Sequence, residues 1–401
     1  MISQNMNRSM VDSRQNPYSF YEEIRSINPV YKGNFLKYPG WYVTGYQEAV
    51  AILKDNRFQT RIPFPETTKK YKALMEIQQH MMLFKNPPDH ARLRMLVSRH
   101  FTPAIIETFR PNIEKIAHNL LDEIKNNNKI DVISDFAFPF ASLVIAKIIG
   151  IPDDDKNMFR EWALSLIQSI DLTRSRRSII DGNKTTVKML AFFKDLILIR
   201  RQSPKNDLIS ELIQQEKDKK LTEEELLATS VLLVIAGHET TVNLISNSLY
   251  CILSNRKEHQ KLIENPTLIK SAIEECLRYE SPTQMIARIA SEDVELNKVH
   301  IKRGEQVYVL IGAANRDPKQ FSNPDVFDIT RNPNPHLAFG SGIHFCLGSA
   351  LARLEAQIAI QVLLQNEINI HPETIKWRKL VGFRAMEEMR GTWGQVICPN
   401  S

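Results

Sequence analysis

A ten-residue segment, Phe339 to Gly348, constrains this chain more than any other stretch of its sequence. It reads FGSGIHFCLG and places Cys346 among three glycines, directly before a helical pattern that starts at Ser349. Glycine reaches positive φ and lets the backbone approach a ligand closely. The N–H groups and the dipole at a helix start favour a thiolate. The segment therefore predicts a ligating cysteine, although a lone cysteine is more often a small buried hydrophobe.

The composition is that of an ordinary globular chain with ample material for a core. Of the 401 residues, 43% are hydrophobic and 24% are charged, and the four cysteines show no Cys-x-x-Cys spacing. Neither a disulfide framework nor a zinc site is expected, which favours a reduced, cytoplasmic compartment. The polar N-terminus shows no signal or anchor segment. The most apolar run, Leu226–Gly237, is too short to span a bilayer. The net charge of +6 fits either a solvated basic surface or an acidic protein partner.

Periodicity predicts a mainly helical protein with a smaller β-containing lobe. Residues 62–88 read as an irregular, functional or mobile loop. The expected helices are Pro17–Arg25, Tyr46–Leu53, Ile113–Ile124, Phe140–Ile149, Asn157–Ile170, Thr186–Arg200, Leu208–Gln215, Leu221–Leu253 and Leu347–Asn366. The expected strands are Val30–Lys32, Gly40–Thr44, Met285–Ala290, Val294–Leu296, Gln306–Leu310, Lys379–Arg384 and Gly394–Ile397.

A second motif opens the helix that follows Pro87 and Pro88. His90 and Arg94 lie four residues apart there and therefore share one helix face. Two cationic or donor groups on one face suit a bound anion, and a solvated basic face fits the same pattern.

The long helix that starts near Thr222 interrupts its apolar pattern with Ala236-Gly237-His238-Glu239-Thr240-Thr241. A mid-helix threonine bonds back to the carbonyl four residues earlier, which here belongs to Ala236. The pattern fits close helix packing through small residues. It equally fits a ligand groove in which Glu239 and Thr240 handle protons.

These motifs together resemble the cytochrome P450 family. The cysteine segment matches the family pattern Phe-Gly-x-Gly-x-His-x-Cys-x-Gly at every fixed position. The resemblance covers essentially the whole chain and implies a single domain, residues 1–401, of the α+β cytochrome P450 fold. It places a haem b between the long central helix and the cysteine loop, with the Cys346 thiolate as axial iron ligand. The haem-binding residues that it implies are His90, Arg94, Arg288, Phe339 and His344.

The resemblance implies that Glu239 and Thr240 lie at the groove where oxygen binds and that they deliver protons there. It also implies a structural lock behind the cysteine loop, formed by Glu275, Arg278 and Arg331. Thiolate ligation favours O–O cleavage, so the implied activity is that of a monooxygenase. The chain has no flavin or nicotinamide domain, so a ferredoxin or flavodoxin must supply the electrons.

Segments such as Lys37–Gly45, Ala236–Ser248 and Tyr279–Met285 resemble a biotin-biosynthesis branch of the family. Its members oxidatively cleave long-chain fatty acyl chains on acyl carrier protein to a pimeloyl unit. The cysteine loop departs from that branch in having fewer histidines. The expected pocket walls are Met81, Met82, Leu83, Ile167, Ile170, Ile235, Met285 and Ile286. The cations expected to receive the carrier protein are Lys69, Lys70, Lys72, Arg174, Arg176 and Arg177.

Three alternatives share the haem motifs. A fatty-acid or macrolide/polyketide hydroxylase would share every haem motif, whereas a peroxide-driven peroxygenase replaces the acid–alcohol pair that Glu239 and Thr240 retain here. A non-catalytic haem-thiolate sensor needs no oxygen groove. We expect a monomer with no nucleic-acid partner and no membrane anchor.

Overall fold

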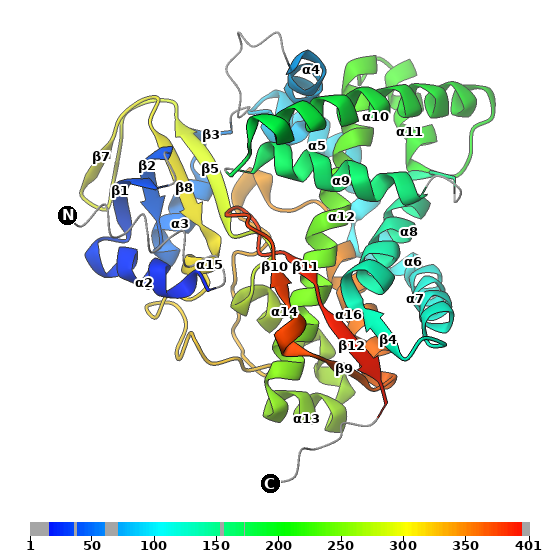
Figure 1. Cartoon of the computed structure of the whole chain (residues 1–401). Helices are drawn as coiled ribbons and strands as arrows, with labels where there is room; N and C mark the ends of the chain where they lie inside the picture. Colours follow the sequence, from blue (N-terminus) through cyan, green and yellow to red (C-terminus); the bar gives the residue numbers. More distant parts are fainter. Residues whose placement is uncertain (1–15, 36–37, 61–70, 153–155, 172, 395–401) are drawn as a thin grey trace. The chain divides into compact units, whose positions relative to one another are not determined.

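The computed structural model describes residues 16–35, 38–60, 71–152, 156–171 and 173–394, without the side chains of 156, 157 and 160. Its chain folds into two compact units, which we treat separately. Unit 1 comprises residues 1–61, 246–349 and 375–387, and unit 2 comprises residues 62–245, 350–374 and 388–401. Figure 1 gives the course of the chain.

Helices dominate the described residues, and short strands, turns and loops make up the rest. The helices are α2 (Tyr18–Ile27), α3 (Tyr46–Lys54), α4 (Lys72–His80), α5 (Asp89–Ser98), α6 (Pro103–Thr108), α7 (Arg110–Ile124), α8 (Phe138–Ile149), α9 (Lys156–Ile170), α10 (Arg176–Gln202), α11 (Leu208–Lys217), α12 (Glu223–Ser254), α13 (Arg256–Glu264), α14 (Ile269–Tyr279), α15 (Ile311–Ala314) and α16 (Ser349–Gln365). The strands are β1 (Val30–Phe35), β2 (Tyr38–Val43), β3 (Phe58–Gln59), β4 (Lys129–Asp131), β5 (Met285–Ala290), β6 (Val294–Leu296), β7 (Val299–Ile301), β8 (Gln306–Leu310), β9 (Ile368–Ile370), β10 (Lys376–Trp377), β11 (Met386–Glu388) and β12 (Arg390–Trp393).

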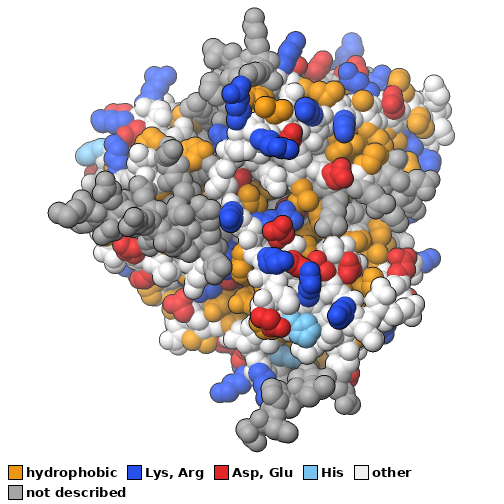
Figure 2. Space-filling view, in the orientation of Figure 1, with side chains coloured by type: hydrophobic (Ala, Val, Ile, Leu, Met, Phe, Trp, Pro, Cys, Tyr) orange, Lys and Arg blue, Asp and Glu red, His pale blue; other side chains and the backbone are white. Residues whose placement is uncertain are grey.

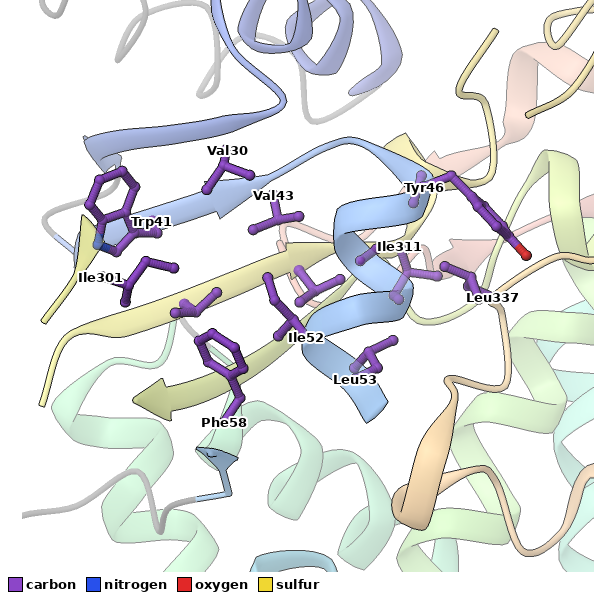
Figure 3. Packing of buried hydrophobic residues seen from close by; sticks show 14 of the residues in the cluster. Val30, Trp41, Val43, Tyr46, Ile52, Leu53, Phe58, Ile301, Ile311 and Leu337 are labelled. Carbon is purple, nitrogen blue, oxygen red and sulfur yellow. The ribbon is translucent and has the colours of Figure 1, made fainter. Parts of the chain in front are cut away.

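Unit 1 is organised around a five-stranded sheet in the order β1-β2-β8-β5-β3. Strands β2 and β8 pair in parallel, with Trp41 opposite Val307, and the other neighbours are antiparallel. Figure 3 shows Val43 of β2 and Ile52 of α3 in one hydrophobic cluster, so α3 covers one face of the sheet. Burial of this apolar face fixes the register, because a slip of one residue would turn it to solvent.

Unit 2 is built from helices, with a three-stranded sheet β4-β12-β9. Its central element is the N-terminal part of α12, which is buried on nearly all sides from Leu226 to Ile235. A capping box starts the helix: the Glu225 N–H donates to Thr222 Oγ1 at 3.2 Å, and the Thr222 N–H donates to the Glu225 carboxylate at 3.0 Å. This start was predicted from the sequence.

Two helical segments are long and apolar enough to cross a membrane, namely Val132–Ile149 and α12. However, 72% and 83% of their respective apolar windows are buried inside the structure. Helices that are hydrophobic on all sides and buried in this way are typical of the core of a large protein.

Most predicted elements are confirmed within a few residues, and three predictions were wrong. Helix α4 lies inside the stretch 62–88, which we expected to be irregular. The prediction was wrong because charged and polar residues interrupt the short apolar face of this helix in the sequence. Helix α10 begins ten residues earlier than predicted, at Arg176, with Ser175 as its N-cap. Residues 379–384 form no strand beyond one bridge between Thr283 and Phe383. Of the predicted strand Gly394–Ile397, the residues after Gly394 lie outside the described residues.

Candidate functional site

The cysteine loop belongs to unit 1 and is held by backbone geometry that glycine makes possible. Gly340 and Gly342 have φ values of 71° and 72°. A Cβ on Gly342 would lie 2.3 Å from the carbonyl oxygen of Leu53, so the loop touches the end of α3 there. The Cys346 N–H donates to the Phe339 carbonyl at 2.9 Å and closes the loop on itself. Cys346 is half-buried and lies three residues before α16.

Arg288, on strand β5 of unit 1, is a buried cation and only 7% exposed. Desolvation lowers the pKa of its guanidinium to about 10. Its Nη1 donates to the Ala287 carbonyl at 2.9 Å, and no carboxylate of the described residues pairs with it. A buried cation that has no carboxylate partner is stabilised when an anionic ligand binds beside it. Arg288 therefore fits the carboxylate of a haem propionate. His344 lies in the cysteine loop itself, in the short helical turn Gly342–His344.

A buried ionic network supports the segment that leads to the cysteine loop. The Glu275 carboxylate accepts two hydrogen bonds of 2.8 Å from Arg278, and both side chains are fully buried. Arg331 donates to the same carboxylate at 3.1 Å. Arg278 also donates to the carbonyls of Asn315 and Pro324, at 3.0 and 2.7 Å. The lock expected from the sequence is therefore present, and it fixes residues 315–331.

His90 and Arg94 belong to unit 2, one turn apart on α5. His90 is buried and Arg94 is half-buried. The helix begins at Asp89, after Pro88, as the sequence predicted. A histidine and an arginine on one partly buried helix face can hold an anionic group between them.

The middle of α12 opens one face of an otherwise buried helix. Ala236 is exposed and Thr240 is half-buried, while Glu239 is only 1% exposed. The Thr240 hydroxyl donates to the Ala236 carbonyl at 2.7 Å, which confirms the predicted back-bond. The hydroxyl oxygen keeps its lone pairs for a further donor at this open face.

Close packing holds the opposite side of this turn against α8. A Cβ on Gly237 would lie 2.8 Å from Cδ1 of Ile145, so a larger residue there would force the Ile145 side chain to shift. His238 is fully buried, and its Nε2 lies 2.6 Å from Ser142 Oγ. The Ser142 hydroxyl also lies 2.7 Å from the Phe138 carbonyl, so His238 is tied through Ser142 to the backbone of α8. The predicted close helix packing is thus confirmed on this side of the helix, while the ligand groove on the open side stays a prediction.

Glu355 of α16 is a buried carboxyl in unit 2 that the sequence did not single out. It is 1% exposed, and Thr241 Oγ1 donates to its Oε2 at 3.4 Å. Burial raises the pKa of Glu355 well above its ordinary value, and the Thr241 hydrogen bond lowers it less. The protonated, neutral form of this carboxyl is therefore favoured by its buried position beside Thr241.

We expect Glu355→Gln to stabilise the protein progressively as the pH rises. Below about pH 4.3, the ordinary Glu value, the carboxyl is protonated in the folded and the unfolded chain, and its stabilising contribution is complete. Above that value only the unfolded chain releases the proton, so wild-type stability falls by about 1.4 kcal/mol per pH unit up to the raised pKa. Urea unfolding of both proteins between about pH 5 and pH 8 measures the difference. A difference that does not change with pH would show that Glu355 is ionised when folded.

An apolar cavity lies in unit 2 between α4, α9, α10 and α12. The space not filled by atoms amounts to about 350 Å³, and this figure includes solvent open to the outside. Nine of its eleven lining side chains are hydrophobic, and the other two are Gln78 and Thr186. Of the eight predicted pocket walls, Met81, Leu83, Ile170 and Ile235 line it. Met82 and Ile167 do not, and Met285 and Ile286 belong to unit 1.

The Cys346 loop and the buried Arg288 of unit 1, and the open turn of α12 in unit 2, each fit the haem-thiolate class of protein that the sequence predicts. The sequence matches the cytochrome P450 family over residues 3–151 and 156–380. The chain belongs to the cytochrome P450 family, and the mainly helical fold with a smaller β lobe confirms the predicted fold class.

Among curated proteins, the chain is similar to the biotin biosynthesis cytochrome P450 of Bacillus subtilis. The two are 58% identical over 381 residues, which cover 94% of this chain and 96% of that protein. The polyketide biosynthesis cytochrome P450 PksS of Bacillus subtilis is 40% identical, covering 93% of this chain and 95% of its own length. Among solved structures, P450BioI in complex with acyl carrier protein ligated to hexadec-9Z-enoic acid superimposes with a TM-score of 0.92. That pair is 57% identical and covers 96% of this chain and all of the other.

Proposed function

We propose that this cytochrome P450 monooxygenase oxidises and cleaves a long-chain fatty acyl chain, carried on acyl carrier protein, to give a pimeloyl unit for biotin biosynthesis. The observation that carries this proposal is the apolar cavity beside the open turn of α12, which suits a hydrocarbon chain. The names of the similar proteins support the acyl carrier and the pathway.

Cys346 is the proposed axial ligand of the haem iron. Arg288, His344 and Phe339 of unit 1, and His90 and Arg94 of unit 2, are the proposed haem-binding residues. The haem, when bound to a thiolate, supplies the oxygen activation and the O–O cleavage. The loop holds the sulfur in place, and the buried guanidinium of Arg288 would bind a carboxylate of the haem in a desolvated position.

Glu239 and Thr240 are the proposed catalytic residues. The Thr240 hydroxyl is oriented by its bond to the Ala236 carbonyl and can donate or accept at the open face. Glu239 is buried one residue before it and can exchange a proton when the open turn admits water. These residues deliver protons, whereas the cavity walls exclude water from the chain that is oxidised.

The electron donor is proposed to be a ferredoxin or flavodoxin, and the protein a cytoplasmic monomer of one domain. Lys72, Arg176 and Arg177 are exposed and available to an acidic carrier protein, whereas Lys69 and Lys70 lie outside the described residues. Arg174 is half-buried and donates to the Asp171 carbonyl at 3.3 Å, so it is less available. Figure 2 shows Lys and Arg side chains next to hydrophobic ones on the face over α9 and α10.

Product analysis tests the proposal directly. Hexadecanoyl acyl carrier protein, incubated with the holoenzyme, a flavodoxin system and oxygen, should yield a seven-carbon dicarboxylic fragment on the carrier. Only monohydroxylated chains would contradict cleavage and favour a fatty-acid hydroxylase. Displacement of the iron-bound water by macrolides but not by acyl ligands would contradict the acyl substrate itself.

A further inference from the structure

The cavity of unit 2 contains one polar group that its surroundings do not satisfy. Gln78 of α4 is 2% exposed, and its Oε1 is buried without a hydrogen-bond partner among the described residues. The other polar lining residue, Thr186, already donates its hydroxyl hydrogen to the Gly182 carbonyl at 2.9 Å. All remaining lining side chains are hydrophobic. The Gln78 amide is therefore the group that a bound molecule would meet.

Gln78 lies at a position of α4 where an apolar side chain would be expected. The other buried side chains of α4 are Leu74, Met75 and Ile77, and Gln78 follows Leu74 by one turn on the face that lines the cavity. A methionine or leucine at this position would complete the apolar face. A buried amide oxygen without a partner, as Gln78 Oε1 is here, loses its hydration and gains nothing in return. The site thus provides a hydrogen bond to something other than the protein.

An acyl chain on a carrier offers a hydrogen-bonding group at one end. This step rests on the proposed function. The methyl end of the chain would leave the amide unsatisfied, whereas the thioester carbonyl accepts a hydrogen bond. The amide oxygen and nitrogen of Gln78 exchange places by a half-turn of the side-chain end, and the two orientations are equivalent in shape. With the NH₂ group turned into the cavity, Gln78 donates to the carbonyl oxygen.

We propose that Gln78 is a specificity-determining residue that binds the thioester carbonyl of the acyl chain and thereby selects the carbon to be oxidised. The cavity extends along α12 from Val231 to Ile235, and Thr240 follows Ile235 by five residues. Five residues of α-helix span about 8 Å along the axis. A carbonyl held in the cavity therefore lies several methylene groups from the carbon presented at Thr240. The fixed carbonyl makes the oxidised position depend on the distance from the thioester, not on chain length.

Two carrier-bound probes separate this role from simple packing. The first is hexadecanoyl acyl carrier protein, and the second is the same carrier with its thiol alkylated by a hexadecyl group, which lacks the carbonyl. Binding is measured as the displacement of the iron-bound water in the holoenzyme. We expect the wild type to bind the thioester roughly tenfold more tightly than the thioether, and Gln78→Met to bind both equally.

The matched control is Leu74→Met on the same face of α4, which should change both affinities alike and keep the preference. Gln78→Glu replaces the donor by an acceptor, so it should lose the preference for the thioester as Gln78→Met does. It replaces Gln78→Met in the test if that variant does not fold. Both Gln78 variants should also oxidise a wider set of chain positions. An unchanged preference with an unchanged product pattern would overturn the proposal and leave an internal water as the partner of Gln78. If the wild type binds neither probe, the acyl function itself fails.

Discussion

Replacement of Cys346 by alanine should abolish the red-shifted absorption of the carbon-monoxide complex of the reduced protein, together with monooxygenase activity. That absorption reports a thiolate bound to haem iron, and the loop presents one thiol for this purpose. The Gly342 backbone lies against Leu53, and the Cys346 N–H donates to the Phe339 carbonyl, so the loop holds the thiol in a fixed position. Thiolate donation favours O–O cleavage, and its loss removes that effect entirely.

The matched control is Cys276→Ala. Cys276 is fully buried on α14, and its thiol lies 3.9 Å from the Ser248 carbonyl, as expected for a structural cysteine. This variant should retain the red-shifted band at full amplitude. Cys346→Ser tests the same point with a smaller change in volume. A Cys346 variant that kept the band would mean that another residue ligates the iron.

Replacement of Arg278 by methionine should destabilise the protein by about 3–5 kcal/mol, because it leaves a buried carboxylate without its main partner. Arg278 and Glu275 are both fully buried, and their ion pair measures 2.8 Å. The substitution also removes the hydrogen bonds to the carbonyls of Asn315 and Pro324. Urea unfolding measures the stability, and the amplitude of the carbon-monoxide band measures how much haem the folded protein retains.

Lys302→Met is the control for this result. The Lys302 ion pair with Asp293 has the same length, 2.8 Å, but both side chains are more than half exposed. Solvation of the two charges and the loss of side-chain entropy offset most of the attraction in such an exposed pair. We therefore expect no measurable change in stability. If Arg278→Met does not fold, Arg331→Met removes the second partner of Glu275 and tests the same network more mildly. Equal effects of Arg278→Met and Lys302→Met would contradict the role assigned to burial.

The cavity shows where sequence reasoning failed and why. Four of its walls were predicted from apolar residues near the expected pocket. Leu74, Gln78 and Phe84 were missed because the stretch that contains them was expected to be irregular. The signal was present, since Leu74, Ile77 and Gln78 follow a helical spacing. A polar residue at a buried helical position is not recognisable as such until the packing against α9, α10 and α12 is known.

The sequence by itself determined the features that depend on local spacing. The cysteine loop needs its glycines at fixed positions, the capping box of α12 needs Thr222 and Glu225 three residues apart, and the Thr240 hydroxyl reaches the carbonyl of Ala236 within the same helix. These geometries are set by a few neighbouring dihedral angles, and a motif records them directly.

The tertiary structure alone decided which distant residues meet and which of them become buried. Ser142 lies 96 residues from His238, and Thr241 lies 114 residues from Glu355, so no local pattern links either pair. The raised pKa of Glu355, the lowered pKa of Arg288 and the unsatisfied amide of Gln78 all follow from burial. Burial depends on the packing of whole helices and strands, and the same side chains in solvent would show none of these properties.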